Sequence, residues 1–370
     1  MSRADGYAPT SVAAPSLRYP SAGVGAPRPP SARRHRRCSL KLVTCLAGLA
    51  LLGATACSAT VPGTAAPTPA PTAGPAANQP PRPAFGAYLD AEMSFPDLAT
   101  LSGQTGLKHV VLSFVLAKGG ACEPAWGGTE PMDSLKGSIE SFRAAGGSVT
   151  AATGGAEGAY LENVCANPTD LAAAYTKILD ATGTNLLDVD IEQNVQIDKV
   201  IGALGLLQRD RGTDITLTLP TELEGLGPGQ LNLVKKAAAT KLDVTVNIMD
   251  MNLDAGGDFG KAMVRAAQTV LTQLRKVYPN DTKAEQYRRL GITMMIGRND
   301  TGPITRLEDS QTVLEFAKTN GVGRLGIWSL ARDFGTCSGQ REAQPDCSGI
   351  AQQDYDFTRR LAAFTGPTPA

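Results

Sequence analysis

Apolar residues follow two different spacings along this chain from Phe85 onward. Short continuous apolar runs alternate with segments in which apolar residues recur every three or four positions, as Leu135, Ile139 and Phe142 do. Continuous runs of this length are typical of strands covered on both faces, and the second spacing is that of an amphipathic helix. The pattern therefore predicts eight strands with helices between them, at 85–89, 109–115, 148–153, 185–192, 214–219, 242–249, 290–296 and 324–329.

Eight strand-helix repeats in succession predict an α/β protein of the (β/α)8 TIM-barrel class. The alternative is a doubly wound parallel sheet, which needs about six strands and usually a Gly-rich phosphate-binding turn after the first of them. No such turn follows Leu89. The barrel is therefore the favoured fold.

The fourth predicted strand alternates acids with aliphatic residues. In an extended strand Asp188, Asp190 and Glu192 project to one face, and the aliphatic residues between them project to the other. Three carboxylates on one face raise the free energy of the ionised set and favour a retained proton, which is useful for acid/base chemistry. Two other interpretations stay open, a site for a hard cation and a solvated edge strand.

In a TIM barrel the active site lies at the carboxyl ends of the strands. Polar and aromatic residues gather at these predicted ends. Such a rim suits a sugar, whose hydroxyls and amides need hydrogen bonds and whose apolar face can lie on an aromatic ring. The candidate substrate-binding residues are Tyr88, Met249, Met251, Asn252, Asn299 and Trp328.

The first 57 residues read as an export signal. A basic cluster that includes Arg36 and Arg37 precedes a short apolar run, and the run ends in small residues before Cys57. The sequence around Cys57 resembles a bacterial lipobox, so Cys57 is a candidate for lipidation, and simple release by a signal peptidase is the alternative. We expect a protein that is exported and then either secreted or anchored to the outer face of the bacterial cell membrane.

Residues 58–84 are almost entirely Ala, Pro, Thr and Gly. Such a segment cannot bury enough apolar surface to offset its ordering entropy, and it predicts a disordered linker. The (β/α)8 domain is then expected over residues 85–366.

Charge differs between the leader and the rest of the chain. Of 35 basic and 35 acidic residues, 27 basic and 34 acidic ones follow Ala56, a net charge of −7. An acidic surface argues against nucleic acid as a partner. Only two histidines occur in the chain, which nearly excludes histidine-based triads and zinc sites, and we expect neither a metal nor an organic cofactor.

Four cysteines follow the leader, Cys122, Cys165, Cys337 and Cys347. An exported domain keeps its disulfides, and four cysteines allow three pairings. We favour Cys122 with Cys165 and Cys337 with Cys347, of which the second pair closes a short local loop.

The fourth strand resembles that of glycoside hydrolase family 18, in particular the bacterial secreted chitinases. The family motif D-G-x-D-x-D-x-E matches at Asp188, Asp190 and Glu192, with Asn185 and Leu186 in the Asp and Gly positions. Further similar segments are 152–155 after the third strand, 246–252 on the sixth, 294–300 on the seventh, and 326–329 with Trp328 on the eighth.

The resemblance implies hydrolysis of β-1,4-linked N-acetylglucosamine in chitin or its oligosaccharides, with retention and without a protein nucleophile. The substrate's own acetamido oxygen would attack the anomeric carbon. Glu192 would act as the acid and then the base, Asp190 would orient the acetamido group, and Asp188 would support Asp190 from behind. We expect a monomer that meets the membrane only through the possible lipid at Cys57.

Two departures from the family pattern keep alternatives open. The family commonly has Tyr and then Asp on the sixth strand, where Met251 and Asn252 stand here. Met251 cannot donate a hydrogen bond to the acetamido oxygen, and Tyr160 is one conceivable substitute. The alternatives are a catalytically weak chitin-binding lectin on the same barrel and an endo-β-N-acetylglucosaminidase.

Overall fold

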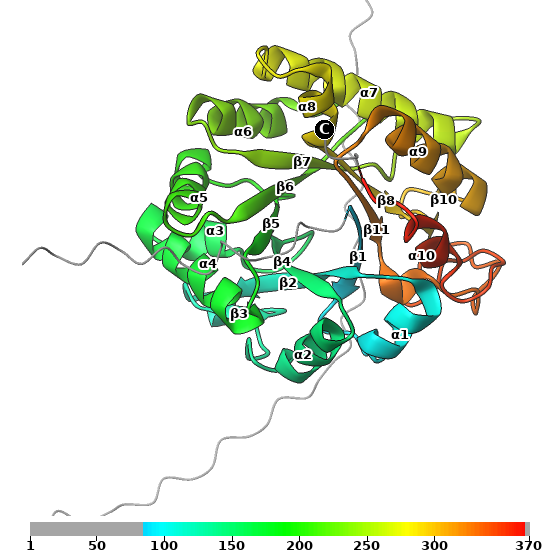
Figure 1. The fold of residues 1–370 in the computed structure, drawn as a ribbon, viewed down its shortest axis with the longest axis horizontal. Coiled ribbons are helices and arrows are strands. Elements are labelled where there is room, and N and C mark those ends of the chain that lie inside the picture. The colour runs from blue at the N-terminus through cyan, green and yellow to red at the C-terminus, as the bar shows by residue number, and fades with distance from the viewer. Residues whose placement is uncertain (1–83, 367–370) are drawn as a thin grey trace, which may run out of the picture. The chain divides into compact units, whose positions relative to one another are not determined.

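The computed structural model describes residues 84–366, and they form a closed parallel barrel ringed by helices (Figure 1). The predicted export signal, Cys57 and nearly all of the predicted linker lie outside the described residues. The barrel strands are β1 (Phe85–Asp90), β2 (His109–Ala117), β4 (Ser148–Gly154), β5 (Leu186–Asp190), β6 (Asp214–Pro220), β7 (Val244–Met249), β8 (Leu290–Met295) and β11 (Arg324–Trp328).

These eight strands are the eight that the apolar runs predict, and the TIM-barrel fold is confirmed. Neighbours run parallel in the order β1, β11, β8, β7, β6, β5, β4, β2, and the additional pairing of β1 with β2 closes the ring. One boundary differs in a way that matters: β5 ends at Asp190, so Glu192 lies just beyond the strand rather than at its last position.

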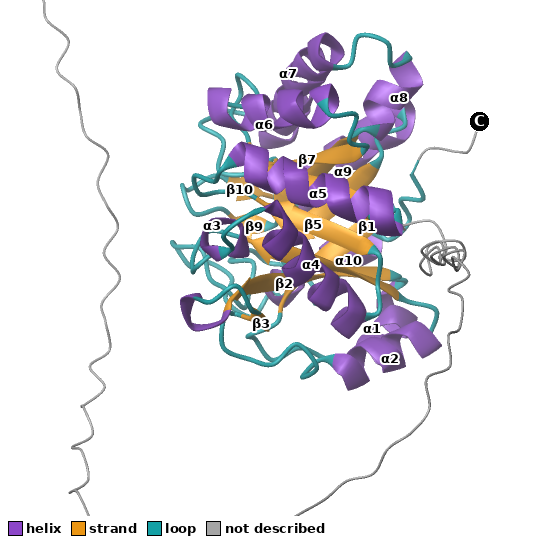
Figure 2. Cartoon of the chain, turned by 90° about the vertical axis from the view of Figure 1, so that its left-hand side faces the viewer, coloured by secondary structure: helices purple, strands orange, loops and turns teal. Residues whose placement is uncertain are grey.

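Helices surround the barrel, and in Figure 2 they lie on both sides of the strands. Capping residues determine where these helices begin and end. In α4, for example, the Asn167 side chain caps the first turn, and Gly183 ends the helix in the left-handed conformation. The helices are α1 (Leu98–Thr105), α2 (Lys136–Ala144), α3 (Leu161–Val164), α4 (Pro168–Thr182), α5 (Ile197–Arg211), α6 (Pro228–Ala239), α7 (Phe259–Val277), α8 (Lys283–Arg288), α9 (Leu307–Asn320) and α10 (Asp356–Leu361).

The main hydrophobic core lies between the barrel and its helices. On β5 the aliphatic residues Leu187 and Val189 are fully buried in it. Because strand residues alternate in direction, the acids of the same strand point into the barrel, whose interior is largely polar. The fold thus uses the two faces of β5 for two purposes, packing outside and chemistry inside.

Three short strands lie near the ends of barrel strands. They are β3 (Pro124–Trp126), antiparallel to β2, and the pair β9 (Gly297–Arg298) and β10 (Ile304–Thr305), which forms a hairpin after β8. Two 3₁₀ turns, Lys118–Gly120 and Leu330–Arg332, complete the described elements. No helix of this part of the chain has both the length and the apolar character that crossing a membrane requires.

Both favoured disulfides are present. Cys122 pairs with Cys165 and joins the turn after β2 to the end of α3. Cys337 pairs with Cys347 within the loop that follows β11. Each bond holds a connecting segment on the side of the barrel where the strands end.

Candidate active site

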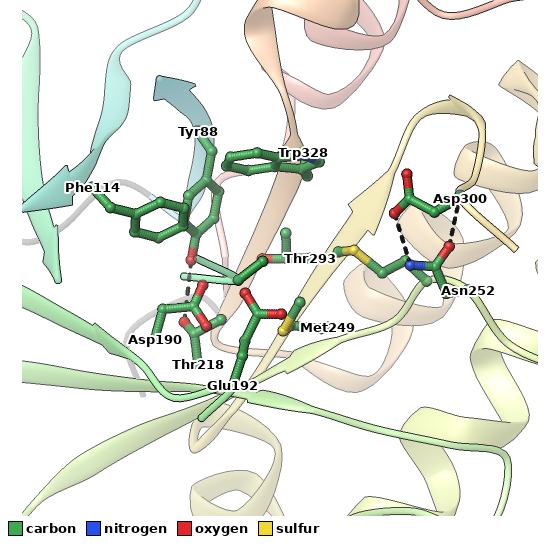
Figure 3. Close-up of a pocket in the computed structure, with 12 residues that line it drawn as sticks. Tyr88, Phe114, Asp190, Glu192, Thr218, Met249, Asn252, Thr293, Asp300 and Trp328 are labelled. Atoms are coloured by element: carbon green, nitrogen blue, oxygen red, sulfur yellow. Dashed lines mark hydrogen bonds between the residues drawn. The ribbon is translucent and has the colours of Figure 1, made fainter. Parts of the chain in front are cut away.

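A cavity opens at the carboxyl ends of the strands (Figure 3). Asp190 and Glu192 reach into it beneath the rings of Phe114 and Trp328. It is lined by Tyr88, Phe114, Ala156, Asp190, Glu192, Thr218, Met249, Met251, Asn252, Thr293, Asp300 and Trp328. Six of the predicted site residues (Tyr88, Met249, Met251, Asn252, Trp328 and Asp190) are therefore brought together with Glu192.

Asp188 does not line the cavity but lies behind it inside the barrel. The Tyr88 hydroxyl donates a hydrogen bond of 2.6 Å to its Oδ2, and Thr218 Oγ1 donates one of 2.6 Å to its Oδ1. Both carboxylate oxygens of this fully buried residue thus have a donor. Such bonds favour the ionised form of a carboxyl group.

Asp190 has the opposite environment. Its side chain is 4% exposed, and its Oδ1 has no hydrogen-bond partner in the described part of the chain. Burial raises the pKa of Asp190 well above its usual range, and the charges of Glu192 and Asp188 raise it further. The protonated form of Asp190 is therefore favoured, and its proton can be shared with a neighbour or a ligand.

Glu192 is placed by contacts of its backbone. Its amide donates a 3.1 Å hydrogen bond to the Tyr160 hydroxyl, which itself donates to the Gly155 carbonyl. Burial and then the negative charge of Asp300 raise the pKa of Glu192 to about 7. A carboxyl group with this pKa can give up a proton and take it back near neutral pH, as a general acid/base must.

Tyr160 is not the substitute for a sugar-binding tyrosine that the sequence suggests. It is 1% exposed, does not line the cavity, and uses its hydroxyl for the two backbone contacts that hold the Glu192 segment. Its part in the site is positional.

Two glycines after β4 let the walls of the site approach one another. Gly154 and Gly155 have φ of 91° and 92°, a region that side chains disfavour. A Cβ on Gly154 would collide with the Asp190 carbonyl, and one on Gly155 would lie 2.6 Å from the Phe114 ring. Glycine at both positions therefore allows β5 and Phe114 to close around the cavity.

The apolar wall of the cavity consists of aromatic and methionine side chains. Phe114 stacks on Trp328 with ring centroids 5.7 Å apart, and Tyr88 meets Trp328 edge-on at 6.0 Å. Met249 and Met251 contribute thioether side chains to the lining. This wall can hold an apolar ring face or a methyl group against the acids.

Asn299, predicted to bind substrate, lies outside the lining of the cavity. It is 1% exposed, and its amide donates to the Met295 and Gly297 carbonyls and to Thr305 Oγ1. Its Oδ1 accepts a hydrogen bond from the backbone N–H of Asn252 at 2.9 Å. With these groups engaged, Asn299 holds the β9–β10 hairpin together.

Asn252 reaches the cavity but binds a neighbouring acid there. Its Nδ2 donates to Asp300 Oδ2 at 3.1 Å, and its Oδ1 accepts from the Asp300 amide at 2.9 Å (Figure 3). The residue has φ of 57°, a left-handed conformation that asparagine tolerates better than most. Asn252 thereby fixes Asp300 at the edge of the cavity.

Asp300 and Phe114 are site residues that the sequence interpretation did not select. Phe114 lies near the end of the predicted strand 109–115, and Asp300 follows the predicted strand 290–296. These positions were a usable signal, but nothing in the sequence shows which side chains at a strand end turn inward. The described residues include no group of three or more His, Cys, Asp or Glu side chains that could hold a metal ion. The acids that line the cavity are Asp190, Glu192 and Asp300.

Comparison with known proteins points to one class of enzyme. The chain is 31% identical over 314 residues to a "Probable bifunctional chitinase/lysozyme" of Escherichia coli, a match that covers 77% of this chain and 35% of the relative. It is 31% identical over 283 residues to "Endochitinase 11" of Metarhizium anisopliae, covering 69% of this chain and 53% of that protein. The chain thus spans between a third and about half of the length of these relatives. No family model matches it.

Solved structures agree over nearly their full length. The catalytic domain of a hyperthermophilic chitinase from Pyrococcus furiosus has a TM-score of 0.72 and 32% identity, and the match covers 77% of this chain and 95% of that domain. Catalytic-site mutants of the active domain 2 of a Pyrococcus furiosus chitinase, solved with chito-oligosaccharides, match with the same TM-score and 31% identity.

Proposed function

We propose that this chain, which belongs to glycoside hydrolase family 18, hydrolyses β-1,4 N-acetylglucosamine linkages in chitin or chito-oligosaccharides. The observation that carries the proposal is Glu192, a carboxyl group with a pKa of about 7 that faces a cavity beside two further acids. The Pyrococcus furiosus domain that matches this chain was solved with chito-oligosaccharides, which supports the same substrate class here.

In the proposed reaction Glu192 protonates the leaving glycosidic oxygen. The acetamido oxygen of the substrate attacks the anomeric carbon as that bond breaks, and an oxazolinium intermediate forms with retention. Glu192, now a carboxylate, then takes a proton from the water that opens the intermediate. Its pKa near neutrality suits both steps, because the group must be protonated in one and ionised in the other.

Asp190 is proposed to orient the acetamido group. It lies in the cavity beside Glu192 and has an oxygen without a partner in the described residues, so it is free to hydrogen-bond a ligand. The unprotonated oxygen of Asp190 can accept the acetamido N–H, and the negative charge behind it on Asp188 would stabilise the positive charge that develops on the acetamido nitrogen. Asp188, held behind by Tyr88 and Thr218, would support that charge balance.

The apolar side of the cavity is proposed to hold the sugar itself. Trp328 offers a ring face, and Met249 and Met251 offer surfaces against which an acetamido methyl group can pack. Asn252 is engaged with Asp300 and so acts on the substrate through that acid.

Replacement of Glu192 tests the proposal. We expect Glu192→Gln to lose at least about a thousandfold in kcat on chito-oligosaccharides, since a glutamine of the same shape can neither donate nor take the proton. Folding and oligosaccharide binding should remain, as checked by circular dichroism and calorimetric titration. The matched control is Glu222→Gln, an exposed acid beyond the end of β6, which should keep wild-type turnover. Full turnover by Glu192→Gln would refute the proposed role.

The lectin and endo-β-N-acetylglucosaminidase alternatives are not favoured. The lectin hypothesis rests on Met251 and Asn252, yet both side chains line a cavity that also contains Asp190 and Glu192. Release of soluble N-acetylglucosamine oligomers by the wild-type protein, in the same product measurement, would argue against the lectin.

The protein is proposed to act outside the cell as a monomer. It would be either secreted or held at the outer face of the cell membrane by a lipid on Cys57. Two disulfides in the barrel support an oxidising compartment. The mass of the amino-terminal peptide of the mature protein decides between secretion and the anchor: an acylated Cys57 would show the anchor, and a peptide that begins beyond Cys57 without lipid would favour secretion.

A further inference from the structure

A chain of polar side chains crosses the interior of the barrel beneath the cavity. It begins at Asp188, whose two oxygens accept from Tyr88 and Thr218, and it continues through Asn247 on β7 to Thr293 on β8. All of these residues are at most 2% exposed. The proposed reaction uses Asp188 but leaves Asn247 without a role.

Asn247 contacts both hydroxyls that bind Asp188. Its Nδ2 lies 3.0 Å from Thr218 Oγ1 and 3.3 Å from the Tyr88 hydroxyl, and 2.9 Å from Thr293 Oγ1. Thr293 Oγ1 in turn donates to Asn247 Oδ1 at 3.1 Å. One amide on β7 thus connects β1, β6 and β8 in the interior of the barrel.

The direction of these hydrogen bonds follows from what each group can donate. A hydroxyl has one proton, and an amide nitrogen donates but cannot accept. Because Thr293 donates to the Asn247 oxygen, the two protons of the Asn247 nitrogen are available for Thr218 and Tyr88. These two hydroxyls then send their own protons to Asp188, which lies 2.6 Å from each. The amide therefore determines the hydrogen-bond direction of both hydroxyls.

The neighbouring backbone makes room for this arrangement. In the strand register Gly291 lies beside Asn247, and Gly326 lies beside Thr293. A Cβ on Gly291 would lie 2.7 Å from Asn247 Oδ1, and a Cβ on Gly326 would collide with Thr293 Oγ1. Glycine within a strand lowers the stability of that strand. At these two positions it leaves space for the side chains of Asn247 and Thr293.

We propose that Asn247 is a positioning residue that keeps the hydrogen bonds of the Tyr88 and Thr218 hydroxyls directed at Asp188. Asp188 then carries the negative charge of the acidic set, and Asp190 keeps its proton. This inference rests on the proposed hydrolytic function and assigns it a residue outside the cavity. The charged groups around the pair are Glu192, beside Asp190, and Arg324, whose charge acts on Tyr88. Without Asn247 one of the two hydroxyls can donate to the other, since they lie 3.1 Å apart, and Asp188, with one donor fewer, can compete for the proton.

The test compares Asn247→Leu, which keeps the side-chain size and removes the donor, with wild type on chito-oligosaccharides. We expect kcat to fall about 10- to 100-fold, as is usual when a residue that orients a catalytic group is lost, and KM to stay within about twofold. The control is Thr245→Val, two residues earlier on the same face of β7, which should keep wild-type turnover.

A second readout does not depend on activity. With ¹³C-labelled aspartate, the Asp188 carboxyl carbon, assigned through Asp188→Asn, should take up its proton at higher pH in Asn247→Leu than in wild type. A folded Asn247→Leu protein with unchanged kcat, or with lowered kcat but an unchanged Asp188 titration, would overturn the inference. If Asn247→Leu does not fold, Asn247→Ala adds no bulk and carries the same expectations. A wild type that cleaves no chito-oligosaccharide would refute the proposed function, whereas the titration would still decide the role of Asn247.

Discussion

Asp300 influences the proton on Glu192 although the two residues lie on different elements. Its carboxylate is held at the cavity edge by the Asn252 amide, and its charge is the second cause, after burial, of the raised pKa of Glu192. A negative charge close to a carboxyl group disfavours ionisation of that group. Asp300 therefore extends the pH range in which Glu192 can still act as the acid.

The change that tests this role is Asp300→Asn, which keeps an oxygen for the Asn252 amide and removes the charge. Because Glu192 must be protonated for bond cleavage, kcat/KM should fall as pH rises through about 7 in the wild type. Loss of the Asp300 charge lowers the pKa of Glu192, so this alkaline fall should move to lower pH in the variant. Profiles of kcat/KM against pH measure the shift, with the exposed Asp254→Asn as the control. An alkaline fall that stays in place would show that burial alone sets the proton affinity.

At the scale of residues, alternation along one strand was enough to predict that Asp188 and Asp190 share the barrel interior. Alternation cannot rank residues that follow a strand, because a loop has no fixed period. Asn299 was selected there, yet it binds backbone carbonyls, whereas its neighbour Asp300 faces the cavity. Asn247 gave no signal at all, since its role depends on strands that are distant in sequence.

At the scale of elements, the sequence predicted what is long and buried and missed what is short. Most barrel strands are continuous apolar runs, and in β5 the residues of the outer face are apolar while the acids point inward, so burial against the helices limits the choice of residues at these positions. The strands β3, β9 and β10 have two or three residues each and no detectable period. Their pairing depends on contacts made by the finished barrel.

The hairpin of β9 and β10 shows why the short elements matter. It carries Asp300, and Asn252 and Asn299 tie it to the end of β7 through side-chain hydrogen bonds to its backbone. Arg332, beyond β11, donates to the Ile296 carbonyl and to the Arg298 carbonyl. The four paired residues of this hairpin thus place the charge of Asp300 at the site, because two neighbouring segments, after β7 and after β11, hold the hairpin.

At the scale of the whole domain, buried acids set the sign of the pH dependence of stability. Burial raises the pKa of Asp250, Asp190, Glu192, Glu162 and Asp333. The folded protein then binds more protons than the unfolded chain as pH rises above the ordinary carboxyl range, so the free energy of unfolding falls as pH rises. Exposed acids whose pKa is lowered by hydrogen bonds, such as Asp97 and Asp258, act in the opposite sense, but solvent screens them. We therefore expect the domain to be more stable near pH 5 than near pH 8.

Asp250 offers the sharpest test of this expectation. It is fully buried at the end of β7, and neither of its carboxylate oxygens has a hydrogen-bond partner in the described part of the chain. Asp250→Asn keeps the shape and removes the ionisation, so the variant should have the higher Tm at pH 8, by more than about 2 °C, with the difference shrinking toward pH 4. Thermal unfolding across this pH range measures both curves, and Asp254→Asn, an exposed acid four residues further on, should follow the wild type. Parallel curves for Asp250→Asn and wild type would mean that Asp250 binds its proton equally in the folded and the unfolded state, so that burial does not raise its pKa and the other buried acids account for any loss of stability at high pH.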